Sequence, residues 1–280
     1  MFYNWFGVPA GGGAECLQLE VVERGPQSRE RAVPLVFVHG AHAGAWCWDE
    51  HFLPYFCDRG YRAVAVSLRG HGGSEGRDQL HYHSLTDYVD DLESVVGTLP
   101  RSPVLVGHSM GGAVVQKYLE RQPAAAAVLM ASVPPYGLGG SVFRLMTTDP
   151  VLFMQISLMH GAGPESVSLE SAGRAVFSEG FDPDLMATYA RRMQGESRRA
   201  LMGMTFLDLP APGRMHPCPM LVMGAEDDTL FSTEDIAATA RAYDADLHLI
   251  PGMAHAMMLE ANWREAADAL ADWLERVEIH

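Results

Sequence analysis

Six short hydrophobic runs recur along the chain, and each has the length of a buried β-strand. Most of them are apolar throughout, without the alternation typical of a sheet that faces water on one side. Continuous apolar runs of this kind favour parallel strands that are covered on both faces. The runs lie at residues 34–38, 61–66, 103–106, 126–131, 219–223 and 246–250.

Segments with helical periodicity separate these runs. The clearest is 84–99, where apolar residues recur on one face and Ser84 or Thr86 supplies the N-cap. Strands and helices that alternate in this way predict an α/β fold with a mostly parallel, doubly wound sheet and right-handed crossovers. Further helices are expected at 49–59 (with an irregularity at Pro54), at 113–120, from about 232 and at 262–277.

The alternation stops between residues 136 and 215. This segment is rich in methionine and interrupted at 161–164 by Gly-Ala-Gly-Pro, and its pattern indicates several short helices. We expect a helical lid (cap) inserted into the fold, with methionines that give the site an adaptable apolar cover. Packing between the lid helices is the alternative role for these side chains. The predicted core therefore comprises 1–135 and 216–280, and the predicted lid is 136–215.

The N-terminal region carries weaker signals. Aromatic residues lead into a glycine run at 11–13, and residues 1–14 are expected to form a loose arm. Residues 16–22 alternate with a period of about two, which predicts an edge strand or part of a hairpin. A basic segment followed by an apolar run is missing from this region, so we expect no signal peptide.

The sequence Gly107-x-Ser109-x-Gly111 lies between the strand at 103–106 and the helix at 113–120. This is the pattern of a nucleophile elbow, a sharp strand-to-helix turn that holds a serine in a strained backbone conformation. The flanking glycines leave room where a Cβ atom would collide with neighbouring elements. The turn presents the hydroxyl at a helix N-terminus, which favours developing negative charge.

A serine nucleophile needs a base, and the base needs an acid that holds it in the correct tautomer. In an elbow fold the chain order is Ser, then Asp or Glu, then His. His255 follows the last strand and is the predicted base, and the loop after the strand at 219–223 supplies the acid. Asp228 is preferred over Asp227 because the apolar Leu-Phe pair at 230–231 anchors its loop, with Glu226 as a third candidate. The other histidines near these elements, His39, His108 and His248, are expected to be structural.

A tetrahedral oxyanion needs two N–H donors. One is expected from Met110, directly after the nucleophile. The other is expected from Ala41, in the loop that follows the strand at 34–38. Because every residue type carries this donor, the assignment rests on position alone.

Five short motifs carry a resemblance to a known family. They are Val-His-Gly-Ala at 38–41, Arg-Gly-His-Gly-x-Ser at 69–74, Gly-His-Ser-Met-Gly-Gly at 107–112, the Asp228 loop, and Gly-x-x-His at 252–255. Together they resemble the α/β-hydrolase superfamily over about 33–135 and 216–280, which implies the α/β-hydrolase fold and leaves the lid unmatched. Ser67 departs from the family, which often carries an acid before Leu-Arg-Gly, and we interpret this difference as structural.

Within the superfamily, residues 39–48 and 255–259 are similar to the branch of plant methyl-esterases and hydroxynitrile lyases. The lyases of that branch place a lysine directly after the catalytic histidine, for the cyanide leaving group. Here that position holds Ala256. The resemblance therefore points to ester hydrolysis and away from cyanohydrin cleavage.

Composition narrows the partners. The chain has 280 residues, 48% of them hydrophobic, and a formal net charge of −15, which argues against nucleic acid or an anionic membrane surface as a partner. No apolar stretch is long enough to span a membrane. The four cysteines show no metal or redox spacing and are expected to be reduced, mostly buried thiols of a cytoplasmic protein. They are Cys16, Cys47, Cys57 and Cys218.

Other chemistry finds little support in the sequence. His81 and His83 flank one residue, without a further ligand at convincing spacing, so no metal is expected. Nucleotide fingerprints are missing, and no cofactor is expected. The arginine pairs at 191–192 and 198–199 are expected to be solvated, with an anionic substrate as their alternative partner.

The predicted function is carboxylic-ester hydrolysis by Ser109, His255 and Asp228 through an acyl-enzyme, on a small to medium apolar ester. The same triad also fits a lactone, a C–C bond next to a ketone, or perhydrolysis of an acid. A receptor-like protein, in which ligand binding and lid closure are the function, is an alternative of another class. The sequence does not fix the oligomeric state, and a homodimer is one of the assemblies that it allows.

Overall fold

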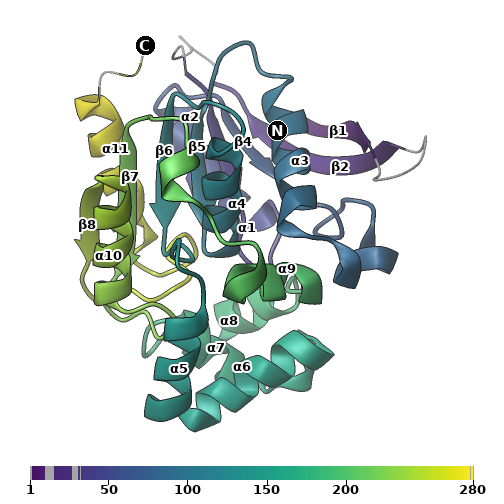
Figure 1. The fold of residues 1–280 in the computed structure, drawn as a ribbon, viewed down its shortest axis with the longest axis vertical. Helices are drawn as coiled ribbons and strands as arrows, with labels where there is room; N and C mark the ends of the chain where they lie inside the picture. Colours follow the sequence, from purple (N-terminus) through teal and green to yellow (C-terminus); the bar gives the residue numbers. More distant parts are fainter. Residues whose placement is uncertain (1, 10–15, 27–30, 32, 278, 280) are drawn as a thin grey trace.

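A computed structural model of the chain describes residues 2–9, 16–26, 31, 33–277 and 279. The described residues form one eight-stranded sheet in the order β1-β2-β4-β3-β5-β6-β7-β8 (Figure 1). The strands are β1 (Phe2–Pro9), β2 (Cys16–Arg24), β3 (Leu35–Val38), β4 (Ala63–Val66), β5 (Val104–His108), β6 (Ala126–Met130), β7 (Met220–Ala225) and β8 (Asp246–Ile250).

Strands β3 to β8 pair in parallel, whereas β1 pairs antiparallel with β2, and β2 antiparallel with β4. The expected fold class, an α/β fold with a mostly parallel sheet, is confirmed. Each of the six runs supplies one parallel strand. A strand covered on both faces must be apolar along its whole length, whereas β8 lies at the edge of the sheet and is exposed at Asp246, Leu247 and His248.

The expectation of a loose N-terminal arm is wrong for residues 2–9, which form β1 and pair with β2 along its whole length. The aromatic residues of this segment, Phe2, Tyr3, Trp5 and Phe6, belong to the types that favour extended backbone. The glycine run that follows outweighed this signal in the prediction. Residues 10–14 of the expected arm lie outside the described residues.

The helices of the core are α1 (Trp46–Asp49), α2 (Phe52–Asp58), α3 (Leu85–Val96), α4 (Met110–Leu119), α10 (Thr233–Tyr243) and α11 (Trp263–Arg276). Of the two N-cap candidates for α3, Ser84 is the cap, and its hydroxyl accepts a hydrogen bond from the Asp87 N–H. The single helix expected at 49–59 is instead two. The break falls at His51, which has φ −136°. Pro54 lies in the first turn of α2, where its missing N–H removes no helical hydrogen bond.

Each face of the sheet packs against its own set of helices. Phe37 and Val106 belong to the cluster with α1, α2 and α11, whereas Val36 and Leu105 belong to the cluster with α3, α4 and α10. Because successive strand residues point to opposite faces, neighbours in one strand contribute to different layers. The sheet is therefore doubly wound.

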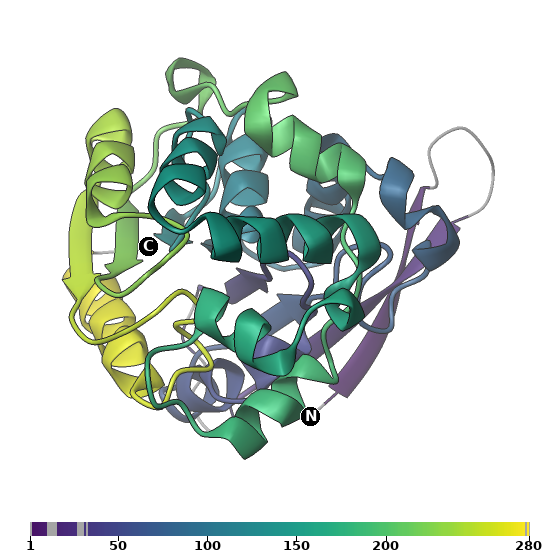
Figure 2. The ribbon, with the colours of Figure 1, turned by 90° about the horizontal axis from the view of Figure 1, so that it is seen from below.

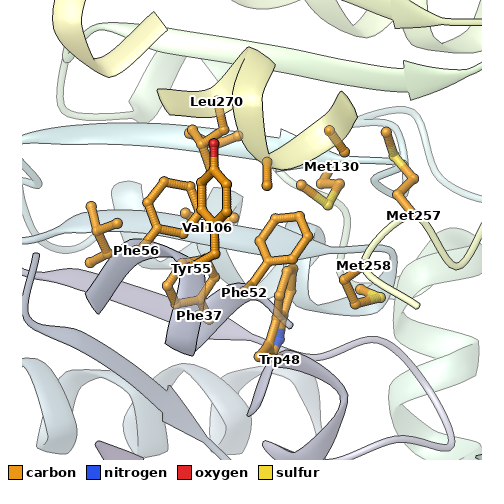
Figure 3. Packing of buried hydrophobic residues seen from close by; sticks show 14 of the residues in the cluster. Phe37, Trp48, Phe52, Tyr55, Phe56, Val106, Met130, Met257, Met258 and Leu270 are labelled. Atoms are coloured by element: carbon orange, nitrogen blue, oxygen red, sulfur yellow. The ribbon is translucent and has the colours of Figure 1, made fainter. Parts of the chain in front are cut away.

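Aromatic side chains fill the layer beneath α2 (Figure 3). The Phe37 ring from β3 lies 5.0 Å from the Trp48 ring and 6.2 Å from the Phe52 ring, measured between centroids. All three side chains are fully buried. Offset and edge contacts at such distances add about 0.5–1.5 kcal/mol per pair to the burial of apolar area. This layer fixes β3, whose carboxyl end leads into the loop of Ala41.

Five helices lie between β6 and β7, within the segment predicted as a lid, and Figure 1 shows them together at one end of the sheet. Figure 2 looks onto these helices from below. They are α5 (Gly139–Thr148), α6 (Pro150–Ala162), α7 (Leu169–Val176), α8 (Pro183–Ala190) and α9 (Arg198–Met202). Among the described helices, none combines the length and apolarity needed to cross a membrane. The described residues also form 3₁₀-helices at η1 (Arg77–Tyr82), η2 (Pro164–Ser166) and η4 (Pro212–Arg214), and a π-helical turn, η3 (Gly203–Leu207), that directly follows α9.

Candidate active site

Ser109 lies between the end of β5 and the start of α4, with φ 51° and ψ −115°. This positive φ is costly for a residue with a side chain and marks a strained turn. A Cβ atom at Gly107 would lie 2.6 Å from the Gly111 carbonyl carbon, and one at Gly111 would lie 2.6 Å from the His39 carbonyl oxygen. Both glycines are therefore needed so that β5, α4 and the loop after β3 can approach one another around the serine.

The two residues expected to supply the oxyanion donors lie at the space in front of this serine. Met110 and Ala41 both line the cavity that Ser109 lines. Neither N–H donates to another protein group in the part of the chain that the structure describes. The Met110 N–H is also the first of α4, where the helix dipole favours negative charge. The two groups are available to bind an oxyanion.

His255 and Asp228 form a buried hydrogen-bonded pair. The distance from His255 Nδ1 to Asp228 Oδ2 is 2.7 Å, and the Asp228 side chain is fully buried. Asp228 Oδ1 accepts hydrogen bonds from the N–H groups of Leu230 (2.7 Å) and Phe231 (3.1 Å). The loop thus holds one carboxylate oxygen while the other orients the imidazole, which leaves His255 Nε2 for other chemistry.

The other two acids of this loop lie elsewhere. Glu226 and Asp227 are exposed to solvent. The Asp227 N–H donates to the Met253 carbonyl oxygen at 2.9 Å, so its backbone links the two loops. Of the three acids, Asp228 is the one that contacts His255.

Ser109 and His255 line the same cavity. Across the described chain, no hydrogen bond joins the Ser109 hydroxyl to the His255 ring. Hydrogen bonds of this kind often tighten only when substrate binds. Two of the three predicted catalytic side chains, Ser109 and His255, therefore line one cavity, and Asp228 lies behind His255, joined to it by a hydrogen bond.

Two further histidines hold the loops of the site in place. His108 Nε2 bonds to the His255 carbonyl oxygen at 2.9 Å, which anchors the backbone of that residue. His39 Nδ1 donates to the Gly40 carbonyl oxygen (2.8 Å), and its Nε2 accepts from the Leu68 N–H (3.0 Å). Since the Leu68 bond requires an unprotonated Nε2, His39 is neutral. Burial and the nearby His71 accordingly lower the pKa of His39 to about 3.

The cavity in front of Ser109 has a volume of about 260 Å³. Among the described residues that line it, none is Asp, Glu, Lys or Arg. Met159, Met193 and Met204 from the segment between β6 and β7 form part of its wall, whereas Met154 and Met202 are exposed. The methionines of that segment thus divide between the cavity wall, the outer surface and, for Met186, packing against the core.

The arginine pairs at 191–192 and 198–199 lie outside this cavity. Arg192 contacts Glu50 and lies over the Trp46 ring, Arg198 donates to a backbone carbonyl oxygen at Gly161, and Arg199 to one at Tyr82. They do not meet a ligand bound at Ser109. His81 and His83 each bond to a backbone carbonyl oxygen. Within the described ranges, no group of three His, Cys, Asp or Glu residues is arranged to hold a metal ion.

Glu20 places a carboxylate next to Ser67, the position at which the family often has an acid. Ser67 Oγ donates to Glu20 Oε2 at 2.7 Å and accepts from the Ala45 N–H at 2.8 Å. The same Glu20 oxygen accepts from the Gly73 N–H at 2.9 Å. Glu20 on β2 thus supplies a carboxylate to this loop through the serine.

One buried carboxylate near the site is not indicated by any pattern in the sequence. Glu196, between α8 and α9, is 1% exposed and contacts residues of three core segments. It lies in an irregular polar stretch with no periodicity, and its partners in the core are more than 100 residues away along the chain. No local signal distinguishes it from a solvated acid.

Known proteins resemble this chain in sequence over most of its length. A family model described as the alpha/beta hydrolase family matches residues 35–272. A monoacylglycerol lipase of Mycolicibacterium smegmatis is 26% identical over 268 residues, which are 89% of this chain and 90% of that protein. A non-heme haloperoxidase of Rhodococcus erythropolis is 30% identical over 247 residues, covering 80% of this chain and 86% of that protein.

Solved structures show the same fold. A thermophilic esterase from Thermogutta terrifontis superimposes with a TM-score of 0.74 and covers 99% of each chain, at 20% sequence identity. At this identity the likeness establishes the fold alone.

The neutral buried His39 predicts acid sensitivity. Its pKa is about 3 in the folded chain and about 6.5 when unfolded, so the unfolded state alone takes up a proton as pH falls through this interval. Between pH 7 and 5 this uptake should lower the free energy of unfolding by about 2 kcal/mol. Urea unfolding of the wild type and of His39→Gln, which keeps a donor and an acceptor, measures the difference. A pH dependence that is the same in both proteins would contradict the assignment.

Proposed function

This chain belongs to the alpha/beta hydrolase family, and we propose that within it the chain is a carboxylic-ester hydrolase that acts through an acyl-enzyme on Ser109. The observation that carries the proposal is the buried Asp228–His255 pair, whose His255 lines one cavity together with the strained Ser109. Esterase and lipase are also among the names of its relatives and structural neighbours.

In the proposed reaction, Ser109 Oγ attacks the ester carbonyl while His255 Nε2 takes the hydroxyl proton. The oxyanion of the tetrahedral intermediate accepts hydrogen bonds from the N–H groups of Ala41 and Met110. The intermediate collapses to the acyl-enzyme, and His255 returns the proton to the departing alcohol. Water then attacks the acyl-enzyme with His255 as base, the acid leaves, and Ser109 regains its proton. Asp228 holds the His255 tautomer and stabilises the imidazolium.

An uncharged, apolar ester fits the cavity best. The lining residues carry no formal charge apart from what the histidines acquire, so a charged acyl or alcohol group would lose its hydration without gaining a partner. The volume of about 260 Å³ lies below the usual range for drug-sized ligands. We therefore propose a substrate of small to medium size.

The segment 136–215 is proposed to act as the lid of this site. It follows β6, precedes β7 and contributes Leu145, Phe153 and Tyr189 to the cavity wall, among others. A cover of this kind excludes water from the acyl-enzyme and selects the substrate.

A second candidate is perhydrolysis, in which hydrogen peroxide in place of water attacks the same acyl-enzyme and releases a peroxy acid. The relative named as a non-heme haloperoxidase, at 30% identity, favours it. Both reactions use the same residues up to the acyl-enzyme. Adding peroxide to an ester assay and titrating the peroxy acid formed distinguishes them.

A series of p-nitrophenyl esters from acetate to decanoate tests the proposal. We expect turnover with an optimum at short to medium acyl chains, because the wall of the cavity limits the length of acyl chain that fits. Ser109→Ala should lower kcat by at least about a thousand-fold while the fold is retained. A well-folded wild type without turnover, or an active Ser109→Ala variant, would contradict ester hydrolysis by this serine.

The neighbouring acids of one loop provide a matched pair of variants. Asp228→Asn should lower kcat by about 10⁴-fold, because an amide next to Nδ1 favours the wrong imidazole tautomer. Asp227→Asn makes the same chemical change at an exposed position and should leave kcat within a few-fold. Steady-state kinetics on one ester compares them, and the opposite ranking would assign the acid to Asp227.

A further inference from the structure

The segment 194–197, which returns from α8 to α9, packs against the loop that carries Ala41. Glu196 is the buried centre of this contact. Its Oε2 accepts from His71 Nε2 (2.9 Å) and from the His42 N–H (3.3 Å). Its Oε1 accepts from the Tyr88 hydroxyl (2.9 Å) and from the Ser197 N–H (2.6 Å). Four donors from four separate places thus converge on one carboxylate.

His42 is the residue directly after Ala41, and its backbone is strained, with φ 64°. A residue with a side chain adopts this conformation only where its surroundings impose it. Three hydrogen bonds between His42 and the segment 194–197 impose it here. Besides the bond to Glu196, the His42 carbonyl oxygen accepts from the Gln194 N–H (3.1 Å), and His42 Nδ1 donates to the Gln194 carbonyl oxygen (2.9 Å).

The charge state of this contact follows from its geometry. His71 Nδ1 faces the Arg69 carbonyl oxygen at 3.1 Å and Nε2 faces Glu196, so both ring nitrogens donate and the ring is an imidazolium. Burial alone would lower the pKa of His71, but the Glu196 carboxylate raises it. Burial alone would raise the pKa of Glu196, but His71 lowers it to about 2. The pair is fully charged and fully buried.

We propose that Glu196 is a positioning residue for the oxyanion hole. By holding the His42 N–H, it fixes the peptide plane between Ala41 and His42. This plane meets the Gly40–Ala41 plane, which carries the Ala41 N–H, at the Ala41 Cα. His39 Nδ1 holds the Gly40 carbonyl oxygen of that second plane, so Glu196 and His39 together fix the backbone on both sides of Ala41. The segment that covers the site thereby also shapes the site's oxyanion donors. This inference rests on the proposed function for the role of Ala41.

A carboxylate is required because an amide accepts through one oxygen only. In Glu196→Gln, the NH₂ group would face either His71 and the His42 N–H, or the Tyr88 hydroxyl and the Ser197 N–H. A neutral His71 or a rotated Tyr88 hydroxyl can adapt to such a group, whereas a backbone N–H cannot. The variant therefore leaves either the His42 N–H or the Ser197 N–H without its partner, and in both cases it loosens the contact between the segment 194–197 and the strained turn at His42.

The test compares Glu196→Gln with Glu260→Gln. Glu260 is also 1% exposed, and its carboxylate accepts from the N–H (2.6 Å) and hydroxyl (2.8 Å) of Ser178, so it too ties the covering segment to the core. It makes no hydrogen bond to the loop of Ala41. A purely structural role of Glu196 predicts that the two variants behave alike.

The readouts are kcat and KM on a p-nitrophenyl ester and the affinity for an alkylboronic acid. The boronate forms a tetrahedral adduct with Ser109 that places an oxygen in the oxyanion hole. In Glu196→Gln we expect kcat and boronate affinity to fall together by about 10- to 100-fold, with KM within about threefold of the wild type. Glu260→Gln should keep all three values within about threefold, whatever its thermal stability.

If Glu196→Gln does not fold, Glu196→Asp replaces it. Aspartate keeps the charge and the pairing with His71, but it is too short to reach the His42 N–H and the Tyr88 hydroxyl together, so the same joint loss is expected. Wild-type kcat and boronate affinity in a folded position-196 variant, or an equal loss in Glu260→Gln, would overturn the proposal.

Boronate binding, measured by calorimetry, needs no turnover and separates this proposal from the proposed function. If the wild type binds the boronate but hydrolyses no ester, the proposed function fails and the comparison of variants still decides the role of Glu196. A wild type that binds no boronate overturns both.

Discussion

The backbone of Ser109 is the constraint on which the site depends. Its φ of 51° places the serine in a conformation that costs energy, and the surrounding elements hold it there. They can do so only because Gly107 and Gly111 allow β5, α4 and the loop after β3 to approach closely. The same approach brings the N–H groups of Ala41 and Met110 to one cavity. The positions of Ser109, Ala41 and Met110 are therefore consequences of one packing arrangement.

Three histidines with different hydrogen-bond partners organise the loops around this turn. His39 is neutral and links the loop after β3 to Leu68. His71 is charged and pairs with Glu196. His255 is oriented by Asp228. Burial alone would favour the neutral form of His39 and of His71; the bond from the Leu68 N–H keeps His39 neutral, whereas Glu196 holds the charged form of His71.

Much of this arrangement could be predicted from the sequence, because it depends on local patterns. The buried strands are continuous apolar runs, and the elbow is a glycine-serine pattern between a strand and a helix. Asp228 and His255 follow consecutive strands, whose carboxyl ends meet at one sheet edge. Their hydrogen bond is then the expected outcome of the topology.

What could not be predicted depends on contacts between distant segments. Strand β1 forms because β2 pairs with it, and a glycine run beside it obscured its strand propensity. The break between α1 and α2 falls at His51, before Pro54, where the sequence predicts the irregularity. Glu196 acquires its role from His42, His71 and Tyr88, which no pattern around residue 196 indicates.

The central claim is that Ser109 is an activated nucleophile. Incubation with an alkyl fluorophosphonate, followed by intact-mass and peptide mass spectrometry, tests it most directly. We expect one adduct per chain, located on Ser109 and missing from Ser109→Ala. A wild type that stays unlabelled, or a label on another residue that persists in Ser109→Ala, would contradict it.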